Sequence, residues 1–220
     1  MTPGTAADTP VDTDADPATE PGQAKPVRKR PKPGERRVQI LQALAAMLES
    51  PESDRITTAA LAARLGVSEA ALYRHFASKA QMFEGLIEFI EHSIFSLANQ
   101  ILERESDPPA QVARIVTTVL QFAEKNPGMG RVMVGDALVL EHARLSARMN
   151  QCLDRLESLL RQPYRQLAEA RNSATPTVDA QAAASVAVSV LIGRIQRHAR
   201  TGFQRRPTEH LDATLRLLLG

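Results

Sequence analysis

The chain has 220 residues and a net charge of +2, and 43% of its residues are hydrophobic while only 4% are aromatic. This composition excludes a chain that is disordered throughout, and it favours aliphatic and alanine side chains packed between helices, in one compact unit or two small ones. The single cysteine, Cys152, excludes an internal disulfide and fits a reducing cytoplasm.

The first 34 residues differ in composition from the rest. Five acidic and no basic residues occur up to Ala24, whereas seven Lys or Arg residues and one Glu lie between Lys25 and Arg37. We therefore predict that residues 1–34 form a disordered tail, acidic and then basic, without the pattern of a signal peptide. The basic end either contacts phosphates or is simply solvated.

A first helix is predicted at residues 35–50, where four aliphatic residues share one face: Ile40, Leu41, Leu44 and Leu48. Two short helices joined by a glycine turn follow. Thr57 or Thr58 can cap the first of them, Gly66 can end it in the left-handed conformation, and Ser68 can cap the second. Two helices joined by so short a turn cross steeply, which is the outline of a helix-turn-helix.

The second short helix has a buried and an outward side. Leu72 and Phe76 repeat a four-residue apolar spacing, which leaves a polar outward side made of Ser68, Ala71, Tyr73, Arg74 and His75. Such a helix is suited to the major groove of DNA. Helix pairs of this kind also occur in proteins that do not bind DNA, so the spacing leaves both interpretations open.

A long helix is predicted from Lys79 to about residue 104, because Ser78 and Gln81 form a capping box. The ammonium of Lys79 lies in this first turn, at the positive end of the helix dipole, which is unfavourable. A phosphate bound there would offset this repulsion. Asp107 and two prolines begin the next helix, which the segment at residues 126–128 (NPG) ends.

The C-terminal half predicts three more helices. Residues 138–171 are helical in pattern, with a kink or break expected at Pro163, and residues 172–176 form a loop. Asp179 is expected to cap a helix that reaches about residue 202, and Thr208 to cap the last one, which reaches Leu219. The apolar run at residues 182–192 is too short to span a membrane and predicts a helix buried on more than one side.

Residues 72–76 read LYRHF and are followed by Ser78 and Lys79. This run resembles the end of the recognition helix and the start of the fourth helix in the TetR family of transcription factors. Further segments are similar to the nucleoid occlusion factors within that family: residues 40–44, 47–50, 55–58, 67–76, 82–83, 86–91, 126–128 and 203–208. The resemblance is dense from residue 36 to residue 94, moderate to about residue 156, and absent from residues 1–34.

The resemblance implies an all-α, TetR-like fold of about nine helices. Residues 1–34 would be the tail, 35–79 a three-helix DNA-binding domain, and 80–220 a helical core whose last two helices pair with those of a second copy. This homodimer would bind palindromic double-stranded DNA, with two recognition helices about one DNA turn apart.

The residues expected at the DNA are Thr57, Thr58, Ser68, Ala71, Tyr73, His75 and Lys79. The hydroxyl and ammonium groups would contact phosphates, and the region of Ala71 would face base edges. Tyr73 and His75 have an alternative role, since both rings can pack partly against the first helix.

The resemblance also implies a protein partner, the tubulin-like division protein FtsZ. An extended peptide needs a groove with apolar anchors and basic residues. Phe89 on the long helix, with Lys125 and Asn126 at the end of the next helix, is expected to provide them, although phenylalanine is more often a core residue. Nucleoid occlusion factors tend to carry Arg where this chain has Lys125, and a basic residue where it has Leu97, so a carboxylate contact here would be weaker or displaced.

No catalytic nucleophile, phosphate loop, metal-ligand spacing or complete dinucleotide fingerprint is visible, so we expect no enzyme, no cofactor and no metal. Three functions compete. The resemblance favours a cytoplasmic, nucleoid-associated factor that binds FtsZ, disrupts its polymers and blocks division over the chromosome, without a membrane partner. The alternatives are a TetR-type repressor released from DNA by a small effector, bound near Phe95, Phe122, Tyr164 and Phe203, and a helical adaptor that does not bind DNA.

Overall fold

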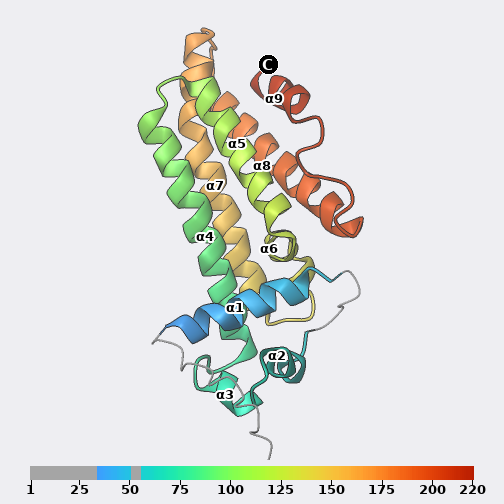
Figure 1. Cartoon of the computed structure of the whole chain (residues 1–220). Coiled ribbons are helices and arrows are strands. Elements are labelled where there is room, and N and C mark those ends of the chain that lie inside the picture. Colours follow the sequence, from blue (N-terminus) through green and yellow to red (C-terminus); the bar gives the residue numbers. More distant parts are fainter. Residues whose placement is uncertain (1–33, 51–55) are drawn as a thin grey trace, which may run out of the picture. The chain divides into compact units, whose positions relative to one another are not determined.

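The computed structural model describes residues 34–50 and 56–220, and all regular structure in these two ranges is helical (Figure 1). This confirms the all-α prediction, while the predicted tail lies outside the described residues apart from Gly34. The elements are α1 (Glu35–Leu48), α2 (Thr58–Leu65), α3 (Glu69–Tyr73), α4 (Lys79–Arg104), α5 (Pro108–Lys125), α6 (Pro127–Met133), the 3-10 turn η1 (Asp136–Leu138), α7 (Ala143–Ala170), α8 (Pro176–Arg200) and α9 (Leu211–Leu219).

Helices α4 and α5 begin and end where the sequence predicts. The backbone N–H of Gln81 donates to Ser78 Oγ at 3.2 Å, and Asp107 caps α5 in the same way through the N–H of Ala110 at 3.1 Å. Asn126 ends α5 as expected, since both its backbone N–H and its side-chain amide donate to the carbonyl of Phe122. Asn126 leaves the helical region, with φ −131° and ψ 68°, and the short helix α6 follows at once.

The sequence predicts a kink or a break at Pro163. Helix α7 runs without interruption through this residue, so a break is wrong, and a kink stays a prediction. A proline in a helix interior removes a backbone hydrogen bond and crowds the preceding turn. Pro163 is buried, and α7 packs against α4, α5 and α8, so tertiary contacts offset that cost. The helix begins at Ala143, because Leu138 lies in the separate turn η1.

The predicted caps of the last two helices are also wrong. Helix α8 begins at Pro176, so Asp179 lies in its first turn and accepts hydrogen bonds from two hydroxyls of the preceding loop. The hydroxyl of Thr208 donates to Glu124 of α5, and α9 begins only at Leu211. The partners of Asp179 lie within six residues of it, whereas Glu124, the partner of Thr208, is 84 residues away and has no local signal.

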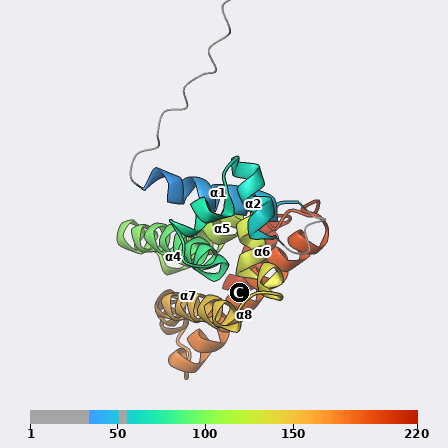
Figure 2. The ribbon, with the colours of Figure 1, turned by 90° about the horizontal axis from the view of Figure 1, so that it is seen from below.

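Helices α4, α5, α7 and α8 pack together as the core, and α1 contacts this group through α4 and α6. In Figure 1, α1 crosses the lower turns of α4, with α2 and α3 beyond it. The view from below places α1 and α2 on the same side of α5 and α6 (Figure 2). The predicted division at residue 79 remains a prediction, because α4 begins in one part and forms the core of the other.

Helices α1 and α6 meet at very short range. A Cβ atom on Gly128 would lie 2.1 Å from the carbonyl oxygen of Ala45, so only glycine allows this approach. Arg131, one turn further along α6, donates to the carbonyls of Leu48 and Ser50 at 3.3 Å each. Its guanidinium also pairs with Asp136 at 2.5 Å. The core therefore holds the end of α1 directly.

Helix α8 has a buried and an open side. Ala184, Ala187 and Leu191 are buried, whereas Val178 and Val186 are 66% and 55% exposed. It is the one helix in the described ranges that is long and apolar enough to cross a membrane, and 33% of its most apolar window is buried within the chain. The predicted burial thus holds for one side of α8, whereas the apolar side chains on its other side are exposed in the single chain.

Cys152 of α7 is unpaired and buried, as expected for a packed thiol. Burial raises the pKa of this thiol to about 12, and the nearby Glu91 carboxylate adds to the rise. The thiolate is the reactive form of cysteine, so Cys152 is inert at neutral pH.

Candidate nucleic-acid interface

Helices α2 and α3 are held in place by local caps. Thr57 Oγ1 accepts from the N–H of Ala60 at 3.1 Å, and Ser68 Oγ accepts from the N–H of Ala71 at 3.3 Å. Gly66 adopts the left-handed conformation with φ 64°, which lets the chain reverse between the two helices. A hydroxyl that accepts from the backbone can still donate its own proton, so both caps remain able to bind phosphate.

The inner side of α3 attaches the helix pair to α1. Leu72 and Phe76 are almost fully buried, and the guanidinium of Arg37 lies 4.1 Å from the centre of the Phe76 ring. Arg37 also donates to the carbonyl of His75 just past the end of α3. The recognition helix is only five residues long, so these contacts and those with α2 fix its direction.

Most of the predicted DNA residues lie on α3, at its ends or at the start of α2. Thr57, Ser68 and Tyr73 are exposed, the last at 46%, while Ala71 and His75 are half-buried. Thr58 differs, because its hydroxyl donates to the carboxylate of Glu69 at 2.5 Å and so ties α2 to α3. Its proton is already engaged in this structure.

Lys79 lies in the first turn of α4 as predicted, but its cation already has a protein partner. Its ammonium pairs with Glu141, from the segment before α7, and lies 5.6 Å from the centre of the Phe83 ring. The side chains of Lys79 and Glu141 are only 20% and 11% exposed. A DNA phosphate would therefore have to share or displace Glu141.

Sequence reasoning missed several charged groups at this surface. Glu69 and Glu141 engage two of the predicted DNA residues, and Arg37 positions α3 from another helix. Arg64 and Arg74 are exposed at the ends of α2 and α3 but were not among the predicted DNA residues. Their positive charge and their position in the two short helices could have identified them as DNA residues. The contacts of Glu141 with Lys79 and of Arg37 with His75 join residues too far apart in the chain for the sequence to predict.

The predicted partner residues lie on the α4–α5 hairpin. Phe89 of α4 is 47% exposed, which rules out a core role within the chain, and Leu97 two turns further on is 45% exposed. Lys125 is exposed in the last turn of α5, while the side-chain amide of Asn126 is held by the carbonyl of Phe122 at 2.8 Å. Helices α4 and α5 leave their turn in opposite directions (Figure 1). Phe89 lies 15 residues before the end of α4, and Lys125 lies 17 residues after the start of α5, so the two are at similar distances along the hairpin from its turn.

Comparison with known proteins gives the chain a family. The model for bacterial regulatory proteins of the tetR family matches residues 40–86, and the SlmA-like model of the tetracyclin repressor-like C-terminal domain matches residues 108–220. The nucleoid occlusion factor SlmA of Marinomonas sp. (strain MWYL1) is 50% identical over 178 residues, which cover 81% of this chain and 90% of that protein. SlmA of Photobacterium profundum is 49% identical over 184 residues, or 83% and 93% of the two chains.

The chain belongs to the SlmA family of nucleoid occlusion factors.

Solved structures confirm the TetR-like fold of this SlmA-family chain. The TetR-family regulator PfmR of Thermus thermophilus has a TM-score of 0.66 at 23% identity, covering 82% of this chain and 94% of that one. The fatty acid degradation regulator FadR of Bacillus halodurans has a TM-score of 0.67 at 16% identity, covering 86% and 97%. At these identities the likeness concerns the fold alone, and the individual DNA and partner residues stay predictions.

Proposed function

We propose that this SlmA-family chain is a DNA-bound inhibitor of cell division, which binds chromosomal DNA as a homodimer and disrupts FtsZ polymers near the nucleoid. The family membership supports the DNA-binding part and the name of its relatives supports the link to the nucleoid. The observation that carries the FtsZ part is the exposed Phe89 on α4, ten residues beyond the start of this helix at Lys79.

The DNA side of the proposal uses α3 as the recognition helix. Thr57, Ser68 and Tyr73 would donate to phosphates, and the half-buried Ala71 with its neighbours on α3 would approach base edges in the major groove. Lys79 would join them by exchanging Glu141 for a phosphate.

The FtsZ side uses the outer surface of the α4–α5 hairpin. An extended peptide could anchor an apolar side chain on Phe89, and Lys125 would attract an acidic group. The side-chain amide of Asn126 keeps one hydrogen to donate, since its bond to the carbonyl of Phe122 uses the other.

One helix connects the two surfaces. Lys79 and Phe89 both belong to α4, ten residues apart, which corresponds to about 15 Å along a rigid helix. Helix α6 also holds α1 through Gly128 and Arg131. A movement of the DNA-binding helices would therefore be transmitted through α4 and α6 to the residues of the partner surface.

Light scattering of FtsZ assembly, with cognate DNA present, tests the partner surface. We expect Phe89→Ala and Lys125→Glu each to need about tenfold more protein than the parent for the same inhibition, because each removes one anchor of the peptide. DNA affinity measured in parallel should stay unchanged, which separates this effect from the loss of DNA binding.

Matched controls make the result specific. Val139→Ala removes an apolar side chain that is 75% exposed outside the hairpin surface, and Arg104→Glu reverses an exposed charge at the far end of α4. Both controls should inhibit FtsZ like the parent. Equal inhibition by all five proteins would remove the assigned surface.

The effector-released repressor finds less support in the core. Phe95 is buried with the guanidinium of Arg155 4.1 Å from its ring centre, and the hydroxyl of buried Tyr164 donates to the carbonyl of Leu218 at 3.4 Å. The Phe95 ring is thus engaged by a cation, whereas Tyr164 also lines a hollow of about 380 Å³ between α7, α8 and α9, so of these two rings only Phe95 counts against an effector pocket.

A further inference from the structure

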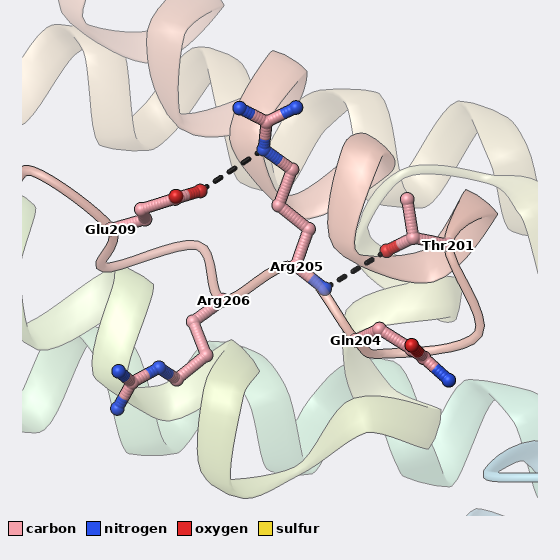
Figure 3. Close-up of a pocket in the computed structure, with 5 residues that line it drawn as sticks. All are labelled: Thr201, Gln204, Arg205, Arg206 and Glu209. Carbon is pink, nitrogen blue, oxygen red and sulfur yellow. Dashed lines mark hydrogen bonds and ion pairs between the residues drawn. The ribbon is translucent and has the colours of Figure 1, made fainter.

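The connection between α8 and α9 carries a concentration of positive charge that the proposed function does not use. Residues 194–210 contain five arginines and two histidines but only one acidic residue. We call Arg194, Arg197, Arg200, Arg205 and Arg206 the arginine cluster; Figure 3 shows two of its members on the loop.

The cluster spans the last turns of α8, which carry Arg194, Arg197 and Arg200, and the following loop, which is tied to α8 by hydrogen bonds. Arg194 donates to the carbonyls of Pro207 and Glu209 at 2.9 Å and 2.6 Å, and the N–H of Arg205 donates to Thr201 Oγ1 at 3.1 Å. The buried ring of His198 lies 2.9 Å, through Nδ1, from the carbonyl of Arg205. The arginines at its surface are therefore presented in a fixed arrangement, which lowers the entropy lost on binding.

Three members of the cluster have free guanidinium groups. Within the described residues, the side chains of Arg197, Arg200 and Arg206 have no hydrogen-bond or ion-pair partner, and all three are exposed. Arg205 alone has a carboxylate partner, Glu209, at 3.0 Å. The pKa of Glu209 is lowered mainly by that hydrogen bond, with Arg197 contributing at longer range. The surface therefore carries a net positive charge, because Glu209 neutralises only one of the arginines.

The surface beside the cluster is hollow and polar. A hollow of about 510 Å³ is lined by Thr201, Gln204, Arg205, Arg206 and Glu209, and the side chains of Arg205 and Arg206 point to opposite sides of the loop (Figure 3). No apolar side chain lines it, whereas a peptide groove requires apolar anchors and a membrane surface favours inserted ones. Guanidinium, hydroxyl and amide donors are the groups that contact DNA phosphates.

The arginine cluster lies further along α8 than the exposed valines, although Arg197 faces the same side of the helix as Val186, because eleven residues are close to three whole turns. The exposed valines lie in the first half of α8, and Arg197 is eleven residues beyond Val186, about 16 Å along the helix. A second copy that covers only the first half of α8 would leave the cluster facing solvent.

We propose that the arginine cluster binds the sugar–phosphate backbone of a second DNA duplex, without sequence preference, while α3 holds the first. The protein then links separate chromosomal segments. The proposal rests on DNA binding through the helix-turn-helix and is independent of FtsZ.

A two-duplex capture experiment with the full chain tests this. A duplex selected from a random pool on the parent protein is fixed to beads and saturated with protein, and a labelled duplex of unrelated sequence is added. We expect the parent to capture the second duplex, with capture falling steeply as salt rises. The variant Arg197→Gln/Arg200→Gln/Arg206→Gln should capture at most about a tenth as much. It lacks three guanidinium groups that would neutralise phosphates and so release the cations condensed on the DNA.

A second variant controls for charge. Arg104→Gln/Arg161→Gln/Arg165→Gln removes three charges from α4 and α7, including two surface ion pairs that contribute little to stability, and should capture like the parent. Circular dichroism and binding of the first duplex should match across all three proteins. Loss of the first duplex in every protein would instead contradict the helix-turn-helix assignment.

Four results would overturn the proposal. The first two are capture by the cluster variant at the level of the parent, and no capture by any protein. The third is a loss of capture in the charge control equal to that in the cluster variant. The fourth is weaker binding of the first duplex in the cluster variant alone, which would place the cluster on that same duplex. Vesicles of anionic phosphatidylglycerol form a separate arm. Arginine-dependent binding to vesicles without capture of DNA would assign the surface to a membrane.

Discussion

Gly128 shows how one residue without a side chain can set the position of two helices. Its Cα approaches the backbone of α1 so closely that any added carbon meets the carbonyl of Ala45 at 2.1 Å. From the sequence, the segment at residues 126–128 predicts the end of a helix, which is right for α5. The close approach itself depends on α1, more than seventy residues earlier, so no local pattern reveals it.

We expect Gly128→Ala to lower the melting temperature by several degrees, because backbone must shift to admit the new carbon at a cost of about 1–3 kcal/mol. Thermal unfolding followed by circular dichroism measures it. Gly130→Ala is the matched control in the same helix, since its new carbon would have its nearest contact, Ile195 Cγ2, at 3.4 Å. Equal melting temperatures for the two variants would contradict the steric argument.

At the scale of elements, α4 is tied to the start of α7 by a series of ion pairs. Lys79 pairs with Glu141, Glu84 with Arg144 at 2.9 Å, and Glu91 with Arg148 at 3.1 Å. The sequence predicts α4 itself, because its cap and apolar spacing are local. It does not predict this series, because each pair joins residues more than fifty positions apart.

A double-mutant cycle separates the two possible roles of Lys79. Lys79→Ala leaves the mostly buried carboxylate of Glu141 unpaired, so we expect a loss of about 1–3 kcal/mol in the free energy of unfolding, most of it recovered by adding Glu141→Gln. If Lys79 binds phosphate, the single Lys79→Ala and the double variant both bind DNA about tenfold more weakly. Urea unfolding and fluorescence anisotropy measure the two quantities.

The single variant Glu141→Gln completes the cycle. It should bind DNA more tightly than the parent, because the ammonium no longer has to leave a carboxylate. Recovery of DNA affinity together with stability in the double variant would show that Lys79 acts on DNA only through the fold.

At the scale of the whole molecule, the open side of α8 and the exposed Leu217 of α9 match the predicted pairing of the last two helices with a second copy. We expect Val186→Arg to give a monomer in light scattering, since it places a charge in an apolar interface. DNA affinity should fall about a hundredfold, because two recognition helices are no longer linked.

Val139→Arg is the control for this prediction. Val139 is 75% exposed in the segment before α7, outside α8 and α9, so this variant should keep the mass of a dimer. A dimeric Val186→Arg protein would place the interface elsewhere.

The sequence by itself determined the elements whose causes are local: the caps at Thr57, Ser68, Ser78 and Asp107, and the glycine turn at Gly66, act within a few residues of themselves. Resemblance supplied the family and the candidate surfaces.

Only the tertiary structure decided which side chains are free to act. Phe89 is exposed, Thr58 and Lys79 are engaged by carboxylates, and Thr208 binds α5 instead of capping α9. Solvent exposure and charge pairing depend on partners that folding brings together, and helical periodicity in the sequence does not predict which residues these partners are.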